Sequence, residues 1–177
     1  MTQARAILLA AAGILMAAPS LAADPPADAP EVLGTFGEWT SFAEGNDKAK
    51  LCYAASAPIK KEGKYTSRGD TAVLVTHNLS DGSFDVVSIV AGYEFKPDED
   101  VLAQVDSKKF TMFSKGDRAW NAEGKDDQAM VAAMKRGRNL LVIGTSSRDT
   151  RTTDTYSLSG FTKAYQAIGK ACPRPKK

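Results

Sequence analysis

Residues 138–172 constrain the fold more than any other part of the sequence. An apolar run of strand type, Leu140–Ile143, ends at Gly144 and is followed by a polar connector. Polar and apolar positions then alternate from Thr153 to Leu158, with the period of two that is typical of a half-buried strand. From Phe161 onward the spacing of apolar residues is that of a helix. One apolar stripe is formed by Phe161, Ala164, Tyr165, Ile168 and Cys172. The pattern predicts a β-hairpin that runs into a short helix ending at a cysteine.

The first 22 residues have the features of a targeting segment. Arg5 precedes an apolar core from Ala6 to Ala18, and Ser20-Leu21-Ala22 supplies the small residues that a signal peptidase requires. This core is shorter than the roughly 20 apolar residues that span a bilayer. We predict a signal peptide over residues 1–22 and no integral membrane segment after cleavage, with a retained anchor as the alternative. The expected location is the periplasm, and outer-membrane association or secretion are further alternatives.

The remaining chain is expected to be one domain with short flanking segments. Residues 23–33 are predicted to be a disordered leader, because Asp24–Pro30 is rich in Pro, Ala and Asp. Residues 34–172 are of single-domain size, and 173–177 form a basic tail. The chain has 23 Lys and Arg against 21 Asp and Glu, and its basic residues are scattered. This charge pattern argues against nucleic acid as a partner.

Cys52 and Cys172 are the whole cysteine complement. Two cysteines in an exported protein predict a disulfide, and only one pairing can form. A metal site would need closely spaced cysteines with histidine, and a redox centre would need C-x-x-C. The predicted bridge would attach the C-terminal helix to an early strand.

Strand-type segments and turn signals predict the fold class. The expected strands, about eight in number, lie at 34–42, 49–55, 71–77, 84–90, 101–105, 110–113, 140–143 and 153–157, and 58–64 is expected to be an exposed loop. Trp39 is expected to point inward. A helix is predicted from Asp126 or Asp127 to Lys135 or Arg136, followed by Gly137 in the left-handed conformation. Parallel βαβ alternation is absent, so we predict a mainly antiparallel β-sandwich or flattened barrel with two short helices.

No catalytic or metal-binding constellation is visible in the sequence, and no cofactor is expected. His77 is the single histidine, and the nucleophile pattern G-x-S-x-G does not occur. Arg68-Gly69-Asp70 matches an integrin-binding tripeptide but is also an ordinary turn before a strand. Asp98–Asp100 offers oxygen ligands, yet the spacing of a calcium loop is missing. The structural interpretation of each of these features is favoured.

The connector Ser146–Thr153 contains the most suggestive polar residues. Arg148 and Arg151 lie among five hydroxyl side chains and could bind a carboxylate or a phosphate through their guanidinium groups. The alternative is that Asp149 and Asp154 neutralise both arginines within the hairpin. We therefore treat Arg148 and Arg151 as candidate anion-binding residues.

The chain resembles the invasion-associated locus B family of bacterial envelope proteins. The resemblance covers nearly all of the expected mature domain and rests on a combination of short segments. These are Gly34–Trp39, Lys50–Tyr53, Arg68–Asp70 with Leu74–His77, Val131–Gly137 and, most strongly, Gly144–Ser146 with Asp154–Phe161 before the terminal cysteine. Members of the family are exported, and its name comes from host-cell invasion by some pathogens, although bacteria that invade nothing also have similar proteins. The family brings no catalytic residues, and it agrees with the predicted disulfide and β-rich fold.

Three functions follow as hypotheses. The first is a non-enzymatic envelope protein that binds an envelope or host protein, in the periplasm or at the cell surface. The second is a small-ligand or anion-binding protein that uses Arg148 and Arg151. The third, an enzyme, has the least support because the sequence displays no catalytic constellation.

Overall fold

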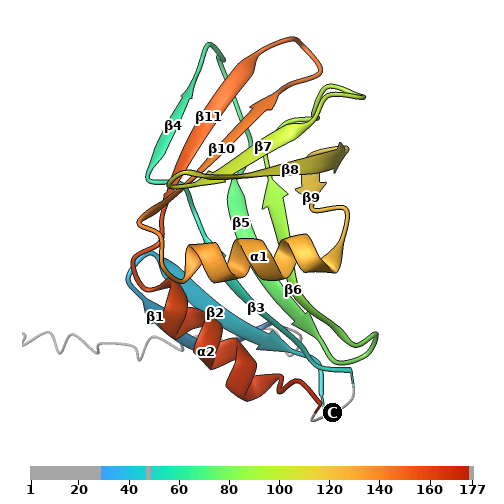
Figure 1. Cartoon of the computed structure of the whole chain (residues 1–177), viewed down its shortest axis with the longest axis vertical. Coiled ribbons are helices and arrows are strands. Elements are labelled where there is room, and N and C mark those ends of the chain that lie inside the picture. Colours follow the sequence, from blue (N-terminus) through green and yellow to red (C-terminus); the bar gives the residue numbers. More distant parts are fainter. Residues whose placement is uncertain (1–28, 47–48, 176–177) are drawn as a thin grey trace, which may run out of the picture.

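The computed structural model describes residues 29–46 and 49–175. The predicted signal peptide lies outside these residues. The described chain forms one antiparallel sheet whose eleven strands have the order β1-β2-β3-β5-β6-β9-β8-β7-β10-β11-β4 (Figure 1). The strands are β1 (Glu31–Phe36), β2 (Trp39–Glu44), β3 (Leu51–Ser56), β4 (Lys60–Gly63), β5 (Ala72–Asn78), β6 (Ser83–Val90), β7 (Val101–Val105), β8 (Lys108–Lys115), β9 (Arg118–Trp120), β10 (Asn139–Thr145) and β11 (Arg151–Ser157).

The predicted mainly antiparallel fold with two short helices is confirmed. The sheet is not a closed barrel, because β1 and β4 each have only one neighbour. Strand β8 joins two parts of the sheet: residues 108–112 pair with β7, whereas residues 113–115 pair with β9. The predicted C-terminal hairpin is present as β10 and β11, paired from Asn139–Ser157 to Thr145–Arg151.

Three strands differ from the sequence-based prediction. The single strand expected over 34–42 is a hairpin, because Gly37, with φ of 58°, turns the chain between β1 and β2. The loop expected over 58–64 contains β4, a fully exposed edge strand that pairs with β11. Strand β9 has three residues, too few for an alternating pattern to identify it. These strands depend on pairing with a neighbour rather than on a hydrophobic period of their own.

Helix α1 (Gly124–Met134) begins earlier than predicted. Its N-cap is Glu123, and Asp126 and Asp127 lie in the first turn, where their charges favour the positive end of the helix. Gly137 does not have a positive φ, so the predicted left-handed cap is wrong. A Cβ at Gly137 would lie 2.4 Å from Cγ1 of Val105. Close packing therefore requires glycine at this position.

Asp127 connects α1 to the sheet. Its Oδ1 accepts a hydrogen bond from the backbone N–H of Val87 (3.0 Å) and another from Nδ2 of Asn121 (2.8 Å). Burial raises the pKa of Asp127, and these two bonds oppose that effect. The carboxylate thus places the first turn of α1 against β6.

Helix α2 (Phe161–Ala171) lies on β1, β2 and β3 (Figure 1). The predicted stripe is confirmed, since Phe161, Ala164 and Ile168 are buried. Trp39 points inward as expected: its ring centroid lies 4.7 Å from that of Phe161, and its Nε1 donates to Ser157 O (2.9 Å). The change from period two to period 3.6 marks the point where the chain leaves β11 and returns over the sheet.

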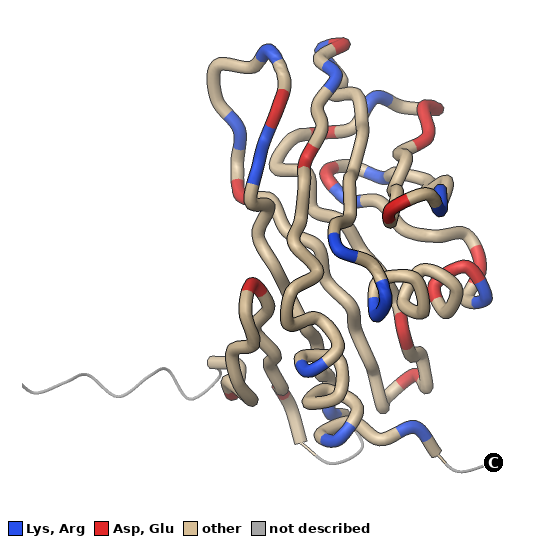
Figure 2. Tube along the Cα trace, turned by 60° about the vertical axis from the view of Figure 1, so that its left-hand side comes forward, with Lys and Arg blue, Asp and Glu red and all other residues tan. Residues whose placement is uncertain are grey.

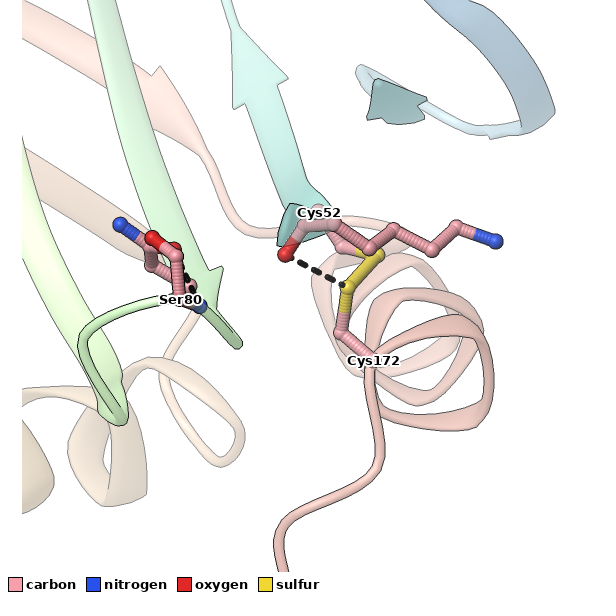
Figure 3. Close-up of a disulfide and its surroundings, with 5 residues drawn as sticks. Cys52, Ser80 and Cys172 are labelled. Atoms are coloured by element: carbon pink, nitrogen blue, oxygen red, sulfur yellow. Dashed lines mark hydrogen bonds between the residues drawn. A yellow bond between two sulfur atoms is a disulfide. The ribbon is translucent and has the colours of Figure 1, made fainter. Parts of the chain in front are cut away.

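The predicted disulfide joins β3 to the end of α2. Cys52 and Cys172 are both fully buried, with Cα atoms 6.0 Å apart and 120 positions apart in the sequence (Figure 3). Sγ of Cys172 also lies 3.7 Å from Lys50 O. The bridge closes most of the domain into one loop.

Within residues 29–46 and 49–175, no helix has the length and hydropathy needed to cross a membrane.

Candidate functional site

A cleft of about 700 Å³ lies where three segments of the chain meet. It is lined by residues 64–69 before β5, 92–94 after β6, and 146–148, 150 and 152 of the β10–β11 hairpin. We term it the Arg148 cleft. Two tyrosines and six serine or threonine residues line this cleft, so its walls offer aromatic rings and hydroxyl groups together.

The floor of the Arg148 cleft contains a buried ion pair. Nη1 and Nη2 of Arg68 donate to Oδ1 and Oδ2 of Asp154 at 2.7 and 2.6 Å, and Nε of Arg68 donates to Ala91 O at 2.6 Å. The two side chains are only 3% and 2% exposed. Burial alone would lower the pKa of Arg68, but the hydrogen bonds and charge of Asp154 outweigh burial and raise that pKa. Arg68 is therefore occupied by the protein itself.

Tyr93 packs over this ion pair. The guanidinium carbon of Arg68 lies 4.8 Å from the centroid of the Tyr93 ring, within the range of a cation–π contact. The Tyr93 hydroxyl hydrogen-bonds Oγ1 of Thr152 (2.7 Å). Tyr93 thus links the segment after β6 to β11 and forms one wall of the cleft.

Two glycines bring two walls of the cleft together. The N–H of Gly69 donates to Gly92 O at 2.9 Å, and Gly92 has φ of 71°. A Cβ at Gly92 would lie 2.5 Å from Gly69 O, which excludes any side chain there. The tripeptide Arg68-Gly69-Asp70 is consequently part of a close backbone contact, and its arginine is buried rather than presented to a receptor.

Ser146 shapes the β10–β11 turn. Its Oγ accepts hydrogen bonds from the N–H groups of Arg148 (3.3 Å) and Thr150 (3.2 Å). The N–H of Ser147 donates to Glu94 O (2.8 Å), which fastens the turn to the segment after β6. These bonds hold Arg148 at the mouth of the cleft.

The structure separates the two candidate arginines. Arg148 lines the cleft, whereas Arg151 is exposed at the start of β11 and is not a lining residue. Thr152, the next residue, faces the cleft, so strand alternation directs Arg151 to the other face of the sheet. The two acids considered as their partners bind other residues: Asp154 binds Arg68, and Asp149 binds Lys96 (2.5 Å).

Arg148 and Lys64 are the cations available to a ligand in this cleft. Both are exposed, and neither forms an ion pair with an acidic side chain of the described residues. Glu94 is the acidic residue that lines the same cleft. The arrangement can bind an anionic group through charge-assisted hydrogen bonds while hydroxyl groups contact the rest of the ligand.

The acidic loop does not form a metal site in this structure. Lys96 lies 3.9 Å from Glu99, and Oγ1 of Thr145 donates to the same carboxylate. Among the residues that the structure describes, no group of three or more His, Cys, Asp or Glu side chains is placed to hold a metal ion.

A second polar cluster surrounds Asp85 and contains His77. The Asp85 carboxylate accepts hydrogen bonds from the Tyr165 hydroxyl (2.6 Å) and Nη2 of Arg174 (2.5 Å), and it lies 3.3 Å from Nε2 of His77. Asp85 has φ of 66°, at the irregularity in β5–β6 pairing. His77 is therefore a buried structural residue. Arg174, in the segment after Cys172, contacts the sheet through Asp85 of β6.

These contacts determine how Asp85 titrates. Burial alone would raise its pKa, but the hydrogen bonds from His77 and Tyr165 and the charge of Arg174 outweigh burial and hold the pKa well below its usual range. Burial, together with the hydrogen bond to Asp85, raises the pKa of Tyr165 to about 12.

Asp85→Asn is expected to lower the free energy of unfolding at neutral pH. It should also make this free energy vary less with pH in the acid range. Since the pKa of Asp85 is lower in the folded than in the unfolded state, only the unfolded chain takes up this proton as the pH falls below 3.8. The stabilisation is complete above that pH and is lost progressively below it. Urea unfolding from neutral pH to about pH 2 measures both effects.

Asp98→Asn is the matched control. Asp98 also has a positive φ (58°), but its side chain is exposed and makes no ion pair in the described chain. An Asp85→Asn variant with the wild-type acid profile would contradict the role assigned to Asp85.

Sequence reasoning did not identify Arg68, Asp154 and Tyr93 as a unit. One signal was present: Asp154 shares its strand face with Tyr156, and both are buried. A buried aspartate needs a partner. Its partner comes from a segment 86 residues away, which no local pattern identifies.

Comparisons with known proteins agree with this structure. The family model described as Invasion associated locus B (IalB) protein matches residues 39–169. A crystal structure of invasion associated protein B from Bartonella henselae is similar in fold, with 19% sequence identity and a TM-score of 0.57, over 81% of this chain and 96% of that chain. A search of curated proteins found no match. Because the family model covers well over half of the sequence, the chain belongs to the invasion associated locus B family.

Proposed function

We propose that this protein is exported and acts by binding, and that the Arg148 cleft holds a small ligand with a carboxylate or phosphate group. The observation that carries the proposal is the pairing of charges around the cleft. Arg68 neutralises Asp154 and Lys96 neutralises Asp149, so Arg148 and Lys64 keep their charges for a ligand. A preformed cleft with few, well-placed polar groups is the usual form of a small-molecule site.

Binding is better supported than catalysis. His77, the single histidine of the chain, is hydrogen-bonded to Asp85 and does not line the cleft. The Tyr93 hydroxyl bonds Thr152, and the Ser146 hydroxyl accepts two backbone N–H groups. Hydroxyl groups used in this way organise the walls and are not paired with a general base.

Arg148→Ala is expected to abolish stabilisation by an anionic ligand. A ligand at about 100 times its Kd stabilises the folded state by about 2.7 kcal/mol. Thermal unfolding of the mature protein, titrated with inorganic phosphate and with glucuronate, measures this effect. Wild type should respond to at least one probe, and Lys64→Ala should respond less than wild type.

Arg151→Ala is the matched control, because it removes the same charge from the other face of the hairpin. This variant should respond like wild type. Equal losses in the Arg148 and Arg151 variants would indicate a non-specific charge effect, and no response to either probe in wild type would refute the anion site.

Export places the binding site in the envelope. Residues 1–22 act as a cleaved signal peptide, 23–33 as a leader, 34–172 as a single domain and 173–177 as a basic tail in this proposal. The buried disulfide supports it, since such bridges persist in oxidising compartments. Family membership supports an envelope protein of the invasion-associated kind, with an envelope or host protein as a further partner. Fractionation and protease shaving of native cells, with N-terminal sequencing, distinguish a periplasmic from a surface location.

A further inference from the structure

One face of the sheet has no cover in the described chain. Helices α1 and α2 both lie on the opposite face (Figure 1). Pairing registers place Val32, Phe42, Tyr53 and Thr76 in one row across β1, β2, β3 and β5. A neighbouring row contains Leu74, Trp120 and Phe113. We term these two rows the outer face.

The outer face is apolar and aromatic. Phe42 stacks on Tyr53 with ring centroids 5.0 Å apart, and Phe113 packs on Trp120 at 5.8 Å. Val32 is 59% exposed and Phe113 is 49% exposed. The aromatic and aliphatic side chains between these two are half-buried. A row of such side chains without a cover is typical of a protein interface.

Charges lie only at the ends of this face. In the backbone trace of Figure 2, several strands have long tan stretches without Lys, Arg, Asp or Glu. Glu44, the last residue of β2, is paired with Leu51 at one corner. Arg118, the first residue of β9, is paired with Val90 and lies at the diagonally opposite corner. Its partner on the other side is Lys115 of β8, a second exposed cation at this corner. None of these three charges has an ion-pair partner among the described residues.

This pattern of charges is complementary to itself. Consider a twofold axis that lies in the plane of the interface. If it crosses the Glu44–Arg118 diagonal at a right angle near Leu74, it exchanges the two corners. The same rotation sets the apolar rows of one copy across those of the other, so that the two patches overlap at their centres. Twofold dimers are the commonest protein assemblies, and their interfaces have apolar centres with charges at the rim.

We propose that the outer face binds a second copy of this chain, with Glu44 of each copy facing Arg118 of the other. The interface leaves the Arg148 cleft open, because no residue of the two rows lines that cleft. Dimer formation is therefore independent of ligand binding.

Sedimentation equilibrium of the mature, oxidised protein tests the proposal from micromolar to sub-millimolar concentration. Wild type should form dimers, and Phe113→Lys should be monomeric. Glu44→Lys and Arg118→Glu should each raise the dimer Kd by about tenfold or more, since like charges then oppose each other twice per dimer. The double variant Glu44→Lys/Arg118→Glu should recover part of the loss, and Lys115, which stays beside position 118, keeps its Kd above the wild-type value.

Two outcomes would overturn the proposal. The first is a monomeric wild type throughout this range, even if the outer face then binds another protein or a vesicle. The second is a dimer that Phe113→Lys and the charge reversals do not affect, because it would use another surface. Thermal unfolding of each variant confirms that it is folded, and Phe113 and Arg118 are exposed positions at which substitution leaves the core intact.

Discussion

Asp154→Asn is expected to lower the free energy of unfolding by about 3–5 kcal/mol, because it leaves Arg68 buried without a counter-charge. The two side chains are almost completely buried, and the Tyr93 ring packs over the guanidinium group. Asparagine has nearly the same volume as aspartate, so the change tests the charge rather than the packing. Urea unfolding at neutral pH gives the free energy directly.

The exposed pair Lys60–Glu62 is the control for this experiment. Its side chains are 64% and 50% exposed, and Glu62→Gln should change stability by less than about 1 kcal/mol. If Asp154→Asn proves equally mild, the buried ion pair does not hold the cleft segments together. An apolar replacement of both partners, Arg68→Met with Asp154→Leu, should cost less than Asp154→Asn alone, because neither charge is then buried unpaired.

Removal of the disulfide in the variant Cys52→Ala/Cys172→Ala is expected to destabilise the protein by about 4–5 kcal/mol. The bridge joins residues 120 positions apart, and a loop of this length strongly restricts the unfolded chain. Both cysteines are buried between β3 and α2, so the contact of α2 with the sheet should weaken first. Urea unfolding and proteolysis of α2 measure the two effects.

The reduced wild-type protein is the control for the disulfide. It should show the same loss as the double variant, since both lack the constraint on the unfolded state. A double variant within about 1 kcal/mol of the oxidised wild type would show that residual structure or packing, rather than the bridge, restrains the chain.

Local periodicity was sufficient to predict the regular elements that have a hydrophobic pattern of their own. The change of period at Phe161 predicted both the C-terminal hairpin and α2, because each element buries one face of its own sequence. The disulfide was predictable from the cysteine count together with the predicted export of the chain. Strand β4 was not, because it is exposed and charged and exists by pairing with β11.

The candidate site was only partly predictable for the same reason. The sequence identified the polar turn that carries Arg148, and it treated Arg148 and Arg151 as equivalent. Arg148 faces the cleft because distant segments form its other walls. Neither arginine pairs with Asp149 or Asp154, because Lys96 and Arg68 from distant segments bind these two acids.

Composition and periodicity are local properties of the chain, so they were enough to predict the fold class, the disulfide pairing and the segment that carries the cleft's arginine. The pairing of Arg68 with Asp154 and of Lys96 with Asp149 is visible only in the folded chain. Charge pairing depends on distances between segments that are far apart in the sequence. That pairing leaves Arg148 available in the cleft and withdraws Arg68 from the surface.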